Sequence, residues 1–451
     1  MRTDADYPRT LIVSAHFSEQ SGTGTFLGRL FSGWPIDRLA TIGGGNLLTD
    51  WRRCGRHYRI GDLELRLRPP FNWLVPASAS GPVQASSAAT AASAPATTVR
   101  PAVSFGRRLA QYPWRGFLRC LGGGEILYRV GPSPQLMAWV AQFKPDILYG
   151  HFSSLNSLRF LRRTQQSLGL PIVLHFMDDF PEGLYRGDIE SRLLRPRYLA
   201  EFAQLVRSAD AAIAICQEMA QAYEQRYRRK ILSLPMPVEL DAYRSAARTQ
   251  WTANHPFRLR YGGRVGWAIR ESLADLARAT HALRQQGADV AFNLVTFNAA
   301  ELPAICRSST GATVQIPGPL ADLPRLQAEA DVLIICYDFD PNSFRQARYS
   351  MPGKLAECMA SGTPILVYGP PGLPVVEYAR REGWGKVVDR RDPTALQAAV
   401  GELMASAALR EQLGRTAQRL AAERHNAETV SKSFRAMLQK ALRNTPEHRA
   451  D

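Results

Sequence analysis

Short apolar runs alternate with longer amphipathic segments along almost the whole chain. The apolar runs have the length of buried strands, and the segments between them repeat apolar residues at helical spacing. Strands are predicted in the first half at residues 10–15, 38–42, 58–67, 146–151, 172–176 and 211–216. In the second half they are predicted at residues 257–260, 290–296, 313–316, 332–337, 364–368 and 386–388. Alternating strands and helices predict an α/β fold with parallel sheets and helical crossovers.

The predicted elements fall into two groups with a boundary within residues 240–256. Prolines mark the extended segment before this boundary, and a new strand begins after Asn254-His-Pro. We therefore expect one α/β domain at residues 1–245, a second at 246–425 and a final helical segment at 426–451. Residues 77–104 consist almost entirely of small residues and carry one charge, so we expect a disordered insertion there.

The composition is that of a globular protein without membrane spans. Of the 451 residues, 45% are hydrophobic and 21% are charged. No apolar run approaches the roughly 18–20 residues that cross a bilayer, and the polar N-terminus does not resemble a secretory signal. The six cysteines contain no C-x-x-C pair, which argues against a zinc site and a disulfide framework and predicts reduced thiols in the cytoplasm.

The formal net charge of +16 is concentrated in the first half. Residues 51–150 carry 13 basic and 4 acidic side chains, together with aromatic clusters at 71–74 and 112–117. Basic residues interleaved with Trp and Phe suit an anionic membrane surface or a nucleic acid. Since no nucleic-acid-binding motif is present, we favour the membrane and expect no nucleic-acid partner. An arginine-rich composition without function is the alternative, because only six of the 56 basic residues are lysines.

A loop of small residues, 18–28, follows the first predicted strand. Gly22, Thr23 and their neighbours would expose backbone N–H groups at the start of a helix, which suits a phosphate. The spacing is G-x-G-x-x-x-G rather than the dinucleotide fingerprint. A simple turn would look much the same, and a nicotinamide-dependent oxidoreductase remains an alternative.

Two further groups of polar residues follow predicted strands. His175, Asp178 and Asp179 come at the carboxyl end of a strand, where ligands bind in open α/β sheets. They could bind a metal, act in acid–base chemistry or hydrogen-bond a polyol, unless the loop is merely charged. Asp338 and Asp340 form a D-x-D pair, but this spacing is common by chance and we expect no metal site.

The segment 350–364 contains the most informative motif. Pro352 and Gly353 begin a short predicted helix that ends at Gly362. Lys354 and Glu357 are three residues apart and share one face near its N-terminus. A cation, a helix N-terminus and a carboxylate together suit a nucleotide sugar, although an ordinary ion pair would have the same spacing.

The motif S-x-P-x-K-L-x-E-x-M-A-S-G-T-P-I-L in this segment resembles the donor site of retaining GT-B glycosyltransferases of family four. Tyr261-Gly-Gly263-Arg264 resembles the G-R-L strand end of the same family. The resemblance implies two Rossmann-like parallel-sheet domains facing a central cleft, with the C-terminal helices returning to the N-terminal domain. The first domain would bind the acceptor and the second a UDP- or GDP-sugar, without a metal or a further cofactor.

The resemblance also implies roles for single residues. Arg264 and Lys354 would neutralise the donor diphosphate and Glu357 would hold the ribose. Gly22 would let the first loop approach the donor, His175 would lie beside the transferred sugar, and Asp178 or Asp179 would orient the acceptor hydroxyl. The expected donor-contacting set is Gly22, Thr23, Gly263, Arg264, Arg270, Tyr349, Lys354, Leu355 and Glu357.

Two positions depart from the family pattern. Tyr349 stands where the first carboxylate of Glu-x7-Glu is usual, and Ile269 stands where a lysine is usual, with Arg270 next to it. We expect a metal-independent, retaining hexosyltransferase that uses a saccharide or lipid-linked acceptor in bacterial surface-glycan synthesis. It would be cytoplasmic, at the inner face of the membrane. The missing carboxylate keeps a non-catalytic GT-B-like binding protein open as an alternative.

Overall fold

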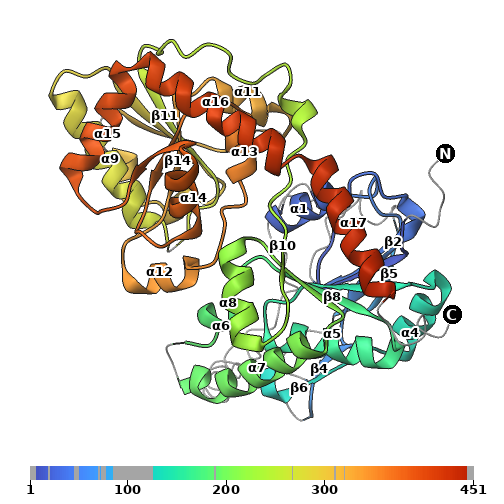
Figure 1. The fold of residues 1–451 in the computed structure, drawn as a ribbon. Helices are drawn as coiled ribbons and strands as arrows, with labels where there is room; N and C mark the ends of the chain where they lie inside the picture. Colours follow the sequence, from blue (N-terminus) through green and yellow to red (C-terminus); the bar gives the residue numbers. More distant parts are fainter. Residues whose placement is uncertain are drawn as a thin grey trace.

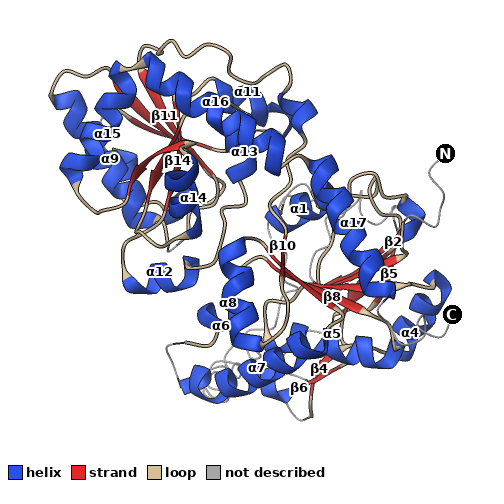
Figure 2. Cartoon of the chain, in the orientation of Figure 1, coloured by secondary structure: helices blue, strands red, loops and turns tan. Residues whose placement is uncertain are grey.

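The computed structural model describes residues 7–18, 21–44, 50–69, 72, 78–84, 125–186, 189–266, 268–308, 311–318 and 320–443. Within this part of the chain, two parallel sheets form the centres of two α/β domains, with helices on both sides of each (Figures 1 and 2). The predicted fold class is therefore confirmed.

The N-terminal sheet has the strand order β10-β9-β8-β7-β1-β2-β3-β5. Its strands pair in parallel except β5, which is antiparallel to β3. The strands are β1 (Thr10–Val13), β2 (Leu39–Gly44), β3 (His57–Ile60), β5 (Gly81–Val83), β7 (Ile147–Gly150), β8 (Ile172–Phe176), β9 (Ala211–Ala214) and β10 (Leu232–Ser233). A separate antiparallel pair is formed by β4 (Leu65–Leu67) and β6 (Tyr128–Val130).

The helices of this domain begin at residues suited to helix starts. The side chains of Ser21, Ser133 and Ser154 accept hydrogen bonds from the first turns of α1, α4 and α5. The helices are α1 (Gly22–Leu30), α4 (Pro134–Phe143), α5 (Leu155–Leu168), α6 (Phe180–Gly183), α7 (Ile189–Ser208) and α8 (Gln217–Tyr227). Short 3-10 turns lie at Ile36–Arg38, Glu125–Leu127 and Leu240–Tyr243.

The C-terminal sheet is parallel throughout, in the order β13-β12-β11-β14-β15-β16. Its strands are β11 (Phe257–Gly262), β12 (Val290–Val295), β13 (Ala312–Gln315), β14 (Val332–Cys336), β15 (Ile365–Tyr368) and β16 (Gly385–Val388). Its helices are α9 (Arg270–Gln285), α10 (Ile305–Ser308), α11 (Leu323–Ala328), α12 (Pro341–Ala347), α13 (Leu355–Ala360), α14 (Pro374–Glu382), α15 (Pro393–Ala405) and α16 (Ala407–Arg424). Two 3-10 turns lie at Ala299–Glu301 and Leu320–Asp322.

The last helix, α17 (Ala427–Arg443), leaves the C-terminal domain and lies beside α1 of the N-terminal domain (Figure 1). The ring of Phe434 packs edge-on against Phe31 with centroids 5.1 Å apart. Ser431 Oγ donates a hydrogen bond to the carbonyl oxygen of Ser32 at 3.1 Å. The C-terminal helix is therefore part of the N-terminal core.

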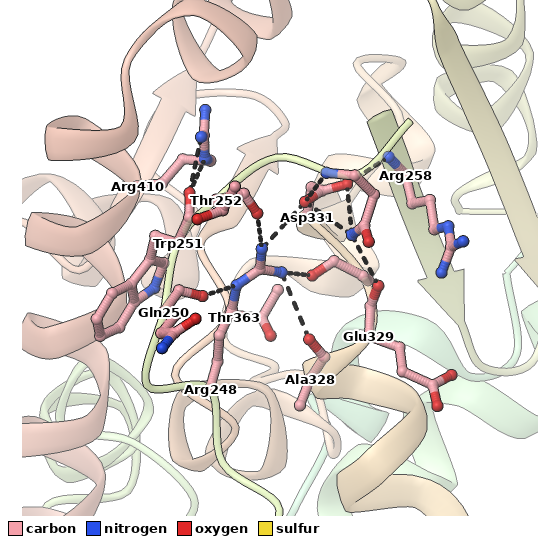
Figure 3. A network of polar contacts seen from close by, with 12 residues as sticks. Arg248, Gln250, Trp251, Thr252, Arg258, Ala328, Glu329, Asp331, Thr363 and Arg410 are labelled. Atoms are coloured by element: carbon pink, nitrogen blue, oxygen red, sulfur yellow. Dashed lines mark hydrogen bonds and ion pairs between the residues drawn. The ribbon is translucent and has the colours of Figure 1, made fainter. Parts of the chain in front are cut away.

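A buried ion pair fixes the segment between the domains to the C-terminal domain (Figure 3). Arg248 Nη2 lies 3.0 Å from Asp331 Oδ1, and its guanidinium also donates to the carbonyl oxygens of Gln250 and Thr252 at 2.8 Å. Asp331 is fully buried and accepts from the backbone N–H of Arg258 at 2.8 Å. Because the guanidinium and the carboxylate have several partners each, this segment is held firmly.

Three local predictions differ from the structure. The single strand predicted at 58–67 is two strands, because the buried Glu64 accepts from the Gly61 N–H at 3.1 Å and closes a turn between them. Gly81–Val83 forms strand β5 inside the segment predicted to be disordered, whereas residues 77 and 85–104 lie outside the described residues. Strand β6 and helices α6, α10 and α12 were not predicted from the sequence.

Candidate functional site

The segment around the predicted donor motif lies between the two domains. Ser350 Oγ donates to Asp178 Oδ1, which follows β8, at 3.1 Å. Cys216 Sγ, at the start of α8, donates to the carbonyl oxygen of Tyr349 at 3.4 Å. Glu357 of α13 forms an ion pair with Arg29 of α1. The motif thus contacts three elements of the N-terminal domain.

Lys354 is held at the carboxyl end of β11. Its Nζ donates to the carbonyl oxygen of Gly262 at 2.9 Å and lies 3.7 Å from the centroid of the Tyr261 ring. Gly263 has φ +149°, and a Cβ there would lie 3.5 Å from the lysine nitrogen. Burial lowers the pKa of Lys354. This ammonium group is therefore poorly hydrated, and an anion that approached it would stabilise its charge.

The loop after β11 is fixed by hydrogen bonds to its backbone, and its arginine is exposed. Tyr261 Oη donates to the carbonyl oxygen of Arg264 at 2.8 Å, and Asn298 bonds both backbone groups of Val265, at 2.9 and 2.6 Å. The Arg264 side chain is exposed and forms no hydrogen bond or ion pair with the residues that the structure describes. A preorganised loop with an unpaired guanidinium suits an anionic ligand.

Glu357 is 8% exposed, and its Oε1 accepts a hydrogen bond from Arg29 Nη2. Residue pattern alone did not point to Arg29, which is separated from Glu357 by 328 positions and lies in no motif. Only the packing of α1 against the C-terminal domain brings the two together. The guanidinium keeps the carboxylate compensated where it would otherwise be an isolated buried charge.

The glycines of the first loop have different roles. A Cβ on Gly24 would lie 2.4 Å from the backbone nitrogen of Ser18, so only glycine fits there. Gly22 is exposed, with nothing within 4 Å of a Cβ, and Thr23 beside it is partly buried. Gly24 is thus needed for packing, while Gly22 leaves the N-terminus of α1 open to a ligand.

The three polar residues at the end of β8 and after it, which were predicted to act together, have different environments in the structure. Asp178 is exposed and contacts Ser350 of the other domain. His175 is 2% exposed, bonds Tyr149 Oη through Nδ1 at 2.8 Å, and has its pKa lowered to about 3 by burial. Asp179 is 2% exposed and accepts from Tyr223 Oη at 2.8 Å. His175 and Asp179 are therefore interior groups, and Asp178 alone of the three faces the donor segment.

Three further residues of the predicted donor-contacting set differ from one another in their exposure and contacts. Leu355 is fully buried in the core, and every residue of the short helix α13 is buried. Arg270 is exposed, with Nη1 3.5 Å from Glu301 Oε2. The Tyr349 ring is partly buried, with the guanidinium of Arg348 5.2 Å from its centroid.

Both carboxylates of the D-x-D pair cap helices. Asp338 accepts from the backbone N–H of Ser272 at 2.7 Å at the start of α9, and Asp340 accepts from Asn342 N–H at 3.0 Å at the start of α12. The described part of the chain contains no group of three or more potential metal-ligating side chains. Among the same residues, no helix is both long and apolar enough to cross a membrane, and the described cysteines are free.

Two family models match the chain. Residues 95–242 match the model of Glycosyltransferase Family 4, and residues 256–406 match the model of Glycosyl transferases group 1. No curated protein matches significantly.

Several solved structures share the fold over nearly their whole length. HepE of Anabaena in complex with UDP and glucose is 14% identical, with a TM-score of 0.60 over 96% of this chain and 99% of that one. Sucrose-phosphate synthase of Thermosynechococcus elongatus is 14% identical, with a TM-score of 0.61 over 97% and 100% of the two chains. A glycosyltransferase of Rickettsia africae is 12% identical, with a TM-score of 0.57 over 97% and 99%. Both domains thus match glycosyltransferase models on a shared fold, and the chain is a GT-B glycosyltransferase of the family 4 type.

Proposed function

We propose that this chain transfers a hexose from a nucleotide-diphosphate sugar to a saccharide or lipid-linked saccharide, with retention of anomeric configuration and without a metal. One observation carries the proposal: Lys354, at the start of α13, is bonded to Gly262 of β11, next to the loop of Arg264. Two cations and a helix start are thus presented together, with the Glu357 carboxylate one turn further on.

This arrangement suits the chemistry of sugar transfer. When the bond between the anomeric carbon and the diphosphate breaks, negative charge develops on the leaving diphosphate. Cations and N–H groups held in place before the reaction stabilise that charge without reorganising. Arg264 and Lys354 would neutralise the diphosphate, and Glu357 would accept hydrogen bonds from the ribose hydroxyls. Asp178, which faces this segment from the N-terminal domain, would orient the acceptor hydroxyl.

The donor class and the cellular location are inferred from a similar structure and from the charge of the chain. HepE was solved with UDP and with UDP-glucose, which supports testing UDP-sugars first and GDP-sugars second. We place the enzyme at the inner face of a bacterial membrane, in surface-glycan synthesis, because of the basic residues 51–150. Much of that region, including Arg107, Arg108, Trp114 and Arg115, lies outside the described residues.

The test is turnover with a panel of UDP- and GDP-sugars and mixed oligosaccharide and lipid-linked acceptors, followed as release of nucleoside diphosphate. We expect release by the wild-type chain with one donor, and a loss of at least tenfold in Lys354→Ala. Equal rates for the two proteins would refute the role of Lys354, and no release with any donor would refute transfer.

A non-catalytic nucleotide-sugar-binding protein is the second candidate, and Tyr349 in place of a carboxylate favours it. Binding of a nucleotide diphosphate without turnover on any acceptor would identify this candidate.

A further inference from the structure

A polar cavity in the N-terminal domain is lined by residues of α5, of α7 and of the β4–β6 pair with its flanking turns. Its volume of about 460 Å³ is within the range of small-ligand pockets. Five arginines and one carboxylate line it, with three apolar or aromatic side chains: Arg68, Arg159, Arg162, Arg163, Arg197, Glu201, Ile126, Tyr128 and Val130. Such a density of guanidinium groups requires an explanation.

The single carboxylate compensates a single arginine. Glu201 Oε1 accepts from Arg159 Nη2 at 2.8 Å and from its Nε at 3.0 Å. The charges of Arg68 and Arg197, both exposed, have no ion-pair or hydrogen-bond partner among the residues that the structure describes. The cavity therefore carries a large excess of positive charge.

The two other arginines are held by neutral acceptors. Arg163 Nη1 donates to the carbonyl oxygen of Val130, and Arg162 Nη1 donates to Gln204 Oε1 at 2.5 Å. Arg162 Nε is buried without any hydrogen-bond partner in the described structure. A buried donor of this kind costs free energy unless a ligand or water occupies it.

The cost of gathering these charges indicates a ligand. Like charges in one cavity repel each other, most strongly where solvent is partly excluded. Arg162 and Arg163, neighbouring positions of α5, add to this repulsion, and neither has an acidic partner among the described residues. An anion of high charge density would reduce the repulsion and pair with the exposed guanidinium groups of Arg68 and Arg197.

We propose that this cavity binds a phosphate-bearing ligand with at least two negative charges. Guanidinium groups bind phosphate oxygens in pairs of parallel hydrogen bonds, and several arginines can share one such group. The cavity is built from α5, α7 and the β4–β6 pair, none of which carries a residue of the donor site. The proposal is therefore independent of the proposed function and describes a second anion site.

The first experiment titrates the full-length chain with inorganic pyrophosphate by calorimetry at constant ionic strength. The test variant is the double substitution Arg163→Gln/Arg197→Gln. The matched control is Arg192→Gln/Arg207→Gln, which removes the same charge from exposed positions outside the cavity. Both variants keep Arg264 and Lys354, so pyrophosphate bound at the donor site contributes equally to each.

We expect a binding site that is weakened at least tenfold in the test variant and unchanged in the control. Equal pyrophosphate binding by the two variants would overturn the proposal, as would a test variant that binds like the wild type. If the test variant failed to fold, Arg68→Gln with Arg197→Gln would replace it, because the Arg68 side chain, unlike that of Arg163, forms no hydrogen bond with the residues that the structure describes.

A second arm distinguishes a lipid headgroup from a soluble phosphate compound. Sedimentation is compared between vesicles of cardiolipin, whose headgroup carries two phosphates, mixed with phosphatidylcholine and vesicles of phosphatidylcholine alone. Binding to the anionic vesicles that is lost only in the test variant assigns the cavity to a lipid headgroup. Pyrophosphate binding without vesicle binding assigns it to a soluble phosphate compound, and the absence of both overturns the proposal.

Discussion

Lys354 connects the C-terminal sheet to the proposed donor site, and its environment makes its charge sensitive to pH. Burial lowers its pKa from the ordinary value of 10.5, so the free protein loses this charge at a lower pH than an exposed lysine would. A bound diphosphate would raise the pKa again, because an anion stabilises the ammonium form.

The first prediction is therefore proton uptake on nucleotide binding. Between the lowered pKa and 10.5, nucleoside diphosphate should bind with uptake of a proton, and its affinity should fall as the pH rises. In Lys354→Arg the charge persists, so the pH dependence should flatten. Calorimetry in two buffers of different ionisation enthalpy measures the uptake. An unchanged proton count in the variant would contradict the assignment.

Glu357 gives the second prediction, which separates a ribose contact from a structural ion pair with Arg29. If the carboxylate accepts from ribose hydroxyls, the wild-type chain should bind UDP more tightly than its 2′,3′-dideoxy analogue. Hydrogen bonds to charged groups contribute about 1.5–3 kcal/mol, which is about tenfold or more in affinity. Glu357→Gln should lose most of this discrimination. Equal discrimination by both proteins would limit Glu357 to its contact with Arg29.

Among single residues, those that share one motif could be predicted best from the sequence. The spacing of Lys354 and Glu357 on one short helix and the position of Arg264 after a strand follow from local pattern alone. The direction in which the side chains of His175 and Leu355 point could not be predicted in this way. Strand β8 and helix α13 are buried on all sides, so their sequences show no alternation of polar and apolar residues that would mark an inward face. The contact of Arg29 with Glu357 could be identified only from the arrangement of the two domains.

Helix α1 and the loop before it provide the third prediction, from two glycines in the same turn. Gly24→Ala should destabilise the chain despite the better helix propensity of alanine, because its Cβ would lie 2.4 Å from the Ser18 nitrogen. Gly22→Ala has open space and should leave the thermal midpoint unchanged or slightly raised. If the donor approaches this helix start, Gly22→Ala should nonetheless weaken nucleotide binding. Full binding by that variant would remove the loop from the donor site.

The segment between the domains provides the fourth prediction. Arg248→Met leaves the buried Asp331 carboxylate without its cation and should cost about 3–5 kcal/mol in the free energy of unfolding. Arg244→Met is the control, since its ion pair with Asp241 is more than four-fifths exposed and contributes about 0–1 kcal/mol. Urea unfolding of both variants measures the difference. Similar losses in the two would show that the Arg248 network is not stabilising.

Most elements could be predicted from the sequence because apolar strands and amphipathic helices differ in length and period. The exceptions have physical causes. Strand β5 contains Gly81 and Pro82, which disfavour strands, and it forms at the sheet edge by pairing with β3. The break between β3 and β4 depends on the buried Glu64, whose partners Tyr58 and Ser133 come from separate elements. Partners that come from distant parts of the chain cannot be identified from the local sequence.

At the scale of the whole molecule, the two domains meet through polar pairs that include the proposed donor-binding residues. Glu357 contacts Arg29, and Ser350 contacts Asp178. Helix α17 adds an apolar connection by packing on α1. Nucleotide binding would therefore act on groups that also hold the domains together. The general two-domain arrangement was predictable from the order of the elements, but these contacts were not.

We propose that the C-terminal domain binds a nucleoside diphosphate through the loop of Arg264. Calorimetric titration of the wild-type chain and Arg264→Gln with UDP and with GDP tests it most directly, since this side chain is exposed and its replacement should not disturb the fold. We predict one site for one of the two nucleotides and an affinity at least tenfold lower in the variant, at an equal thermal midpoint of the free proteins. Undiminished affinity in Arg264→Gln, or no binding of either nucleotide to the folded wild-type chain, would contradict the claim.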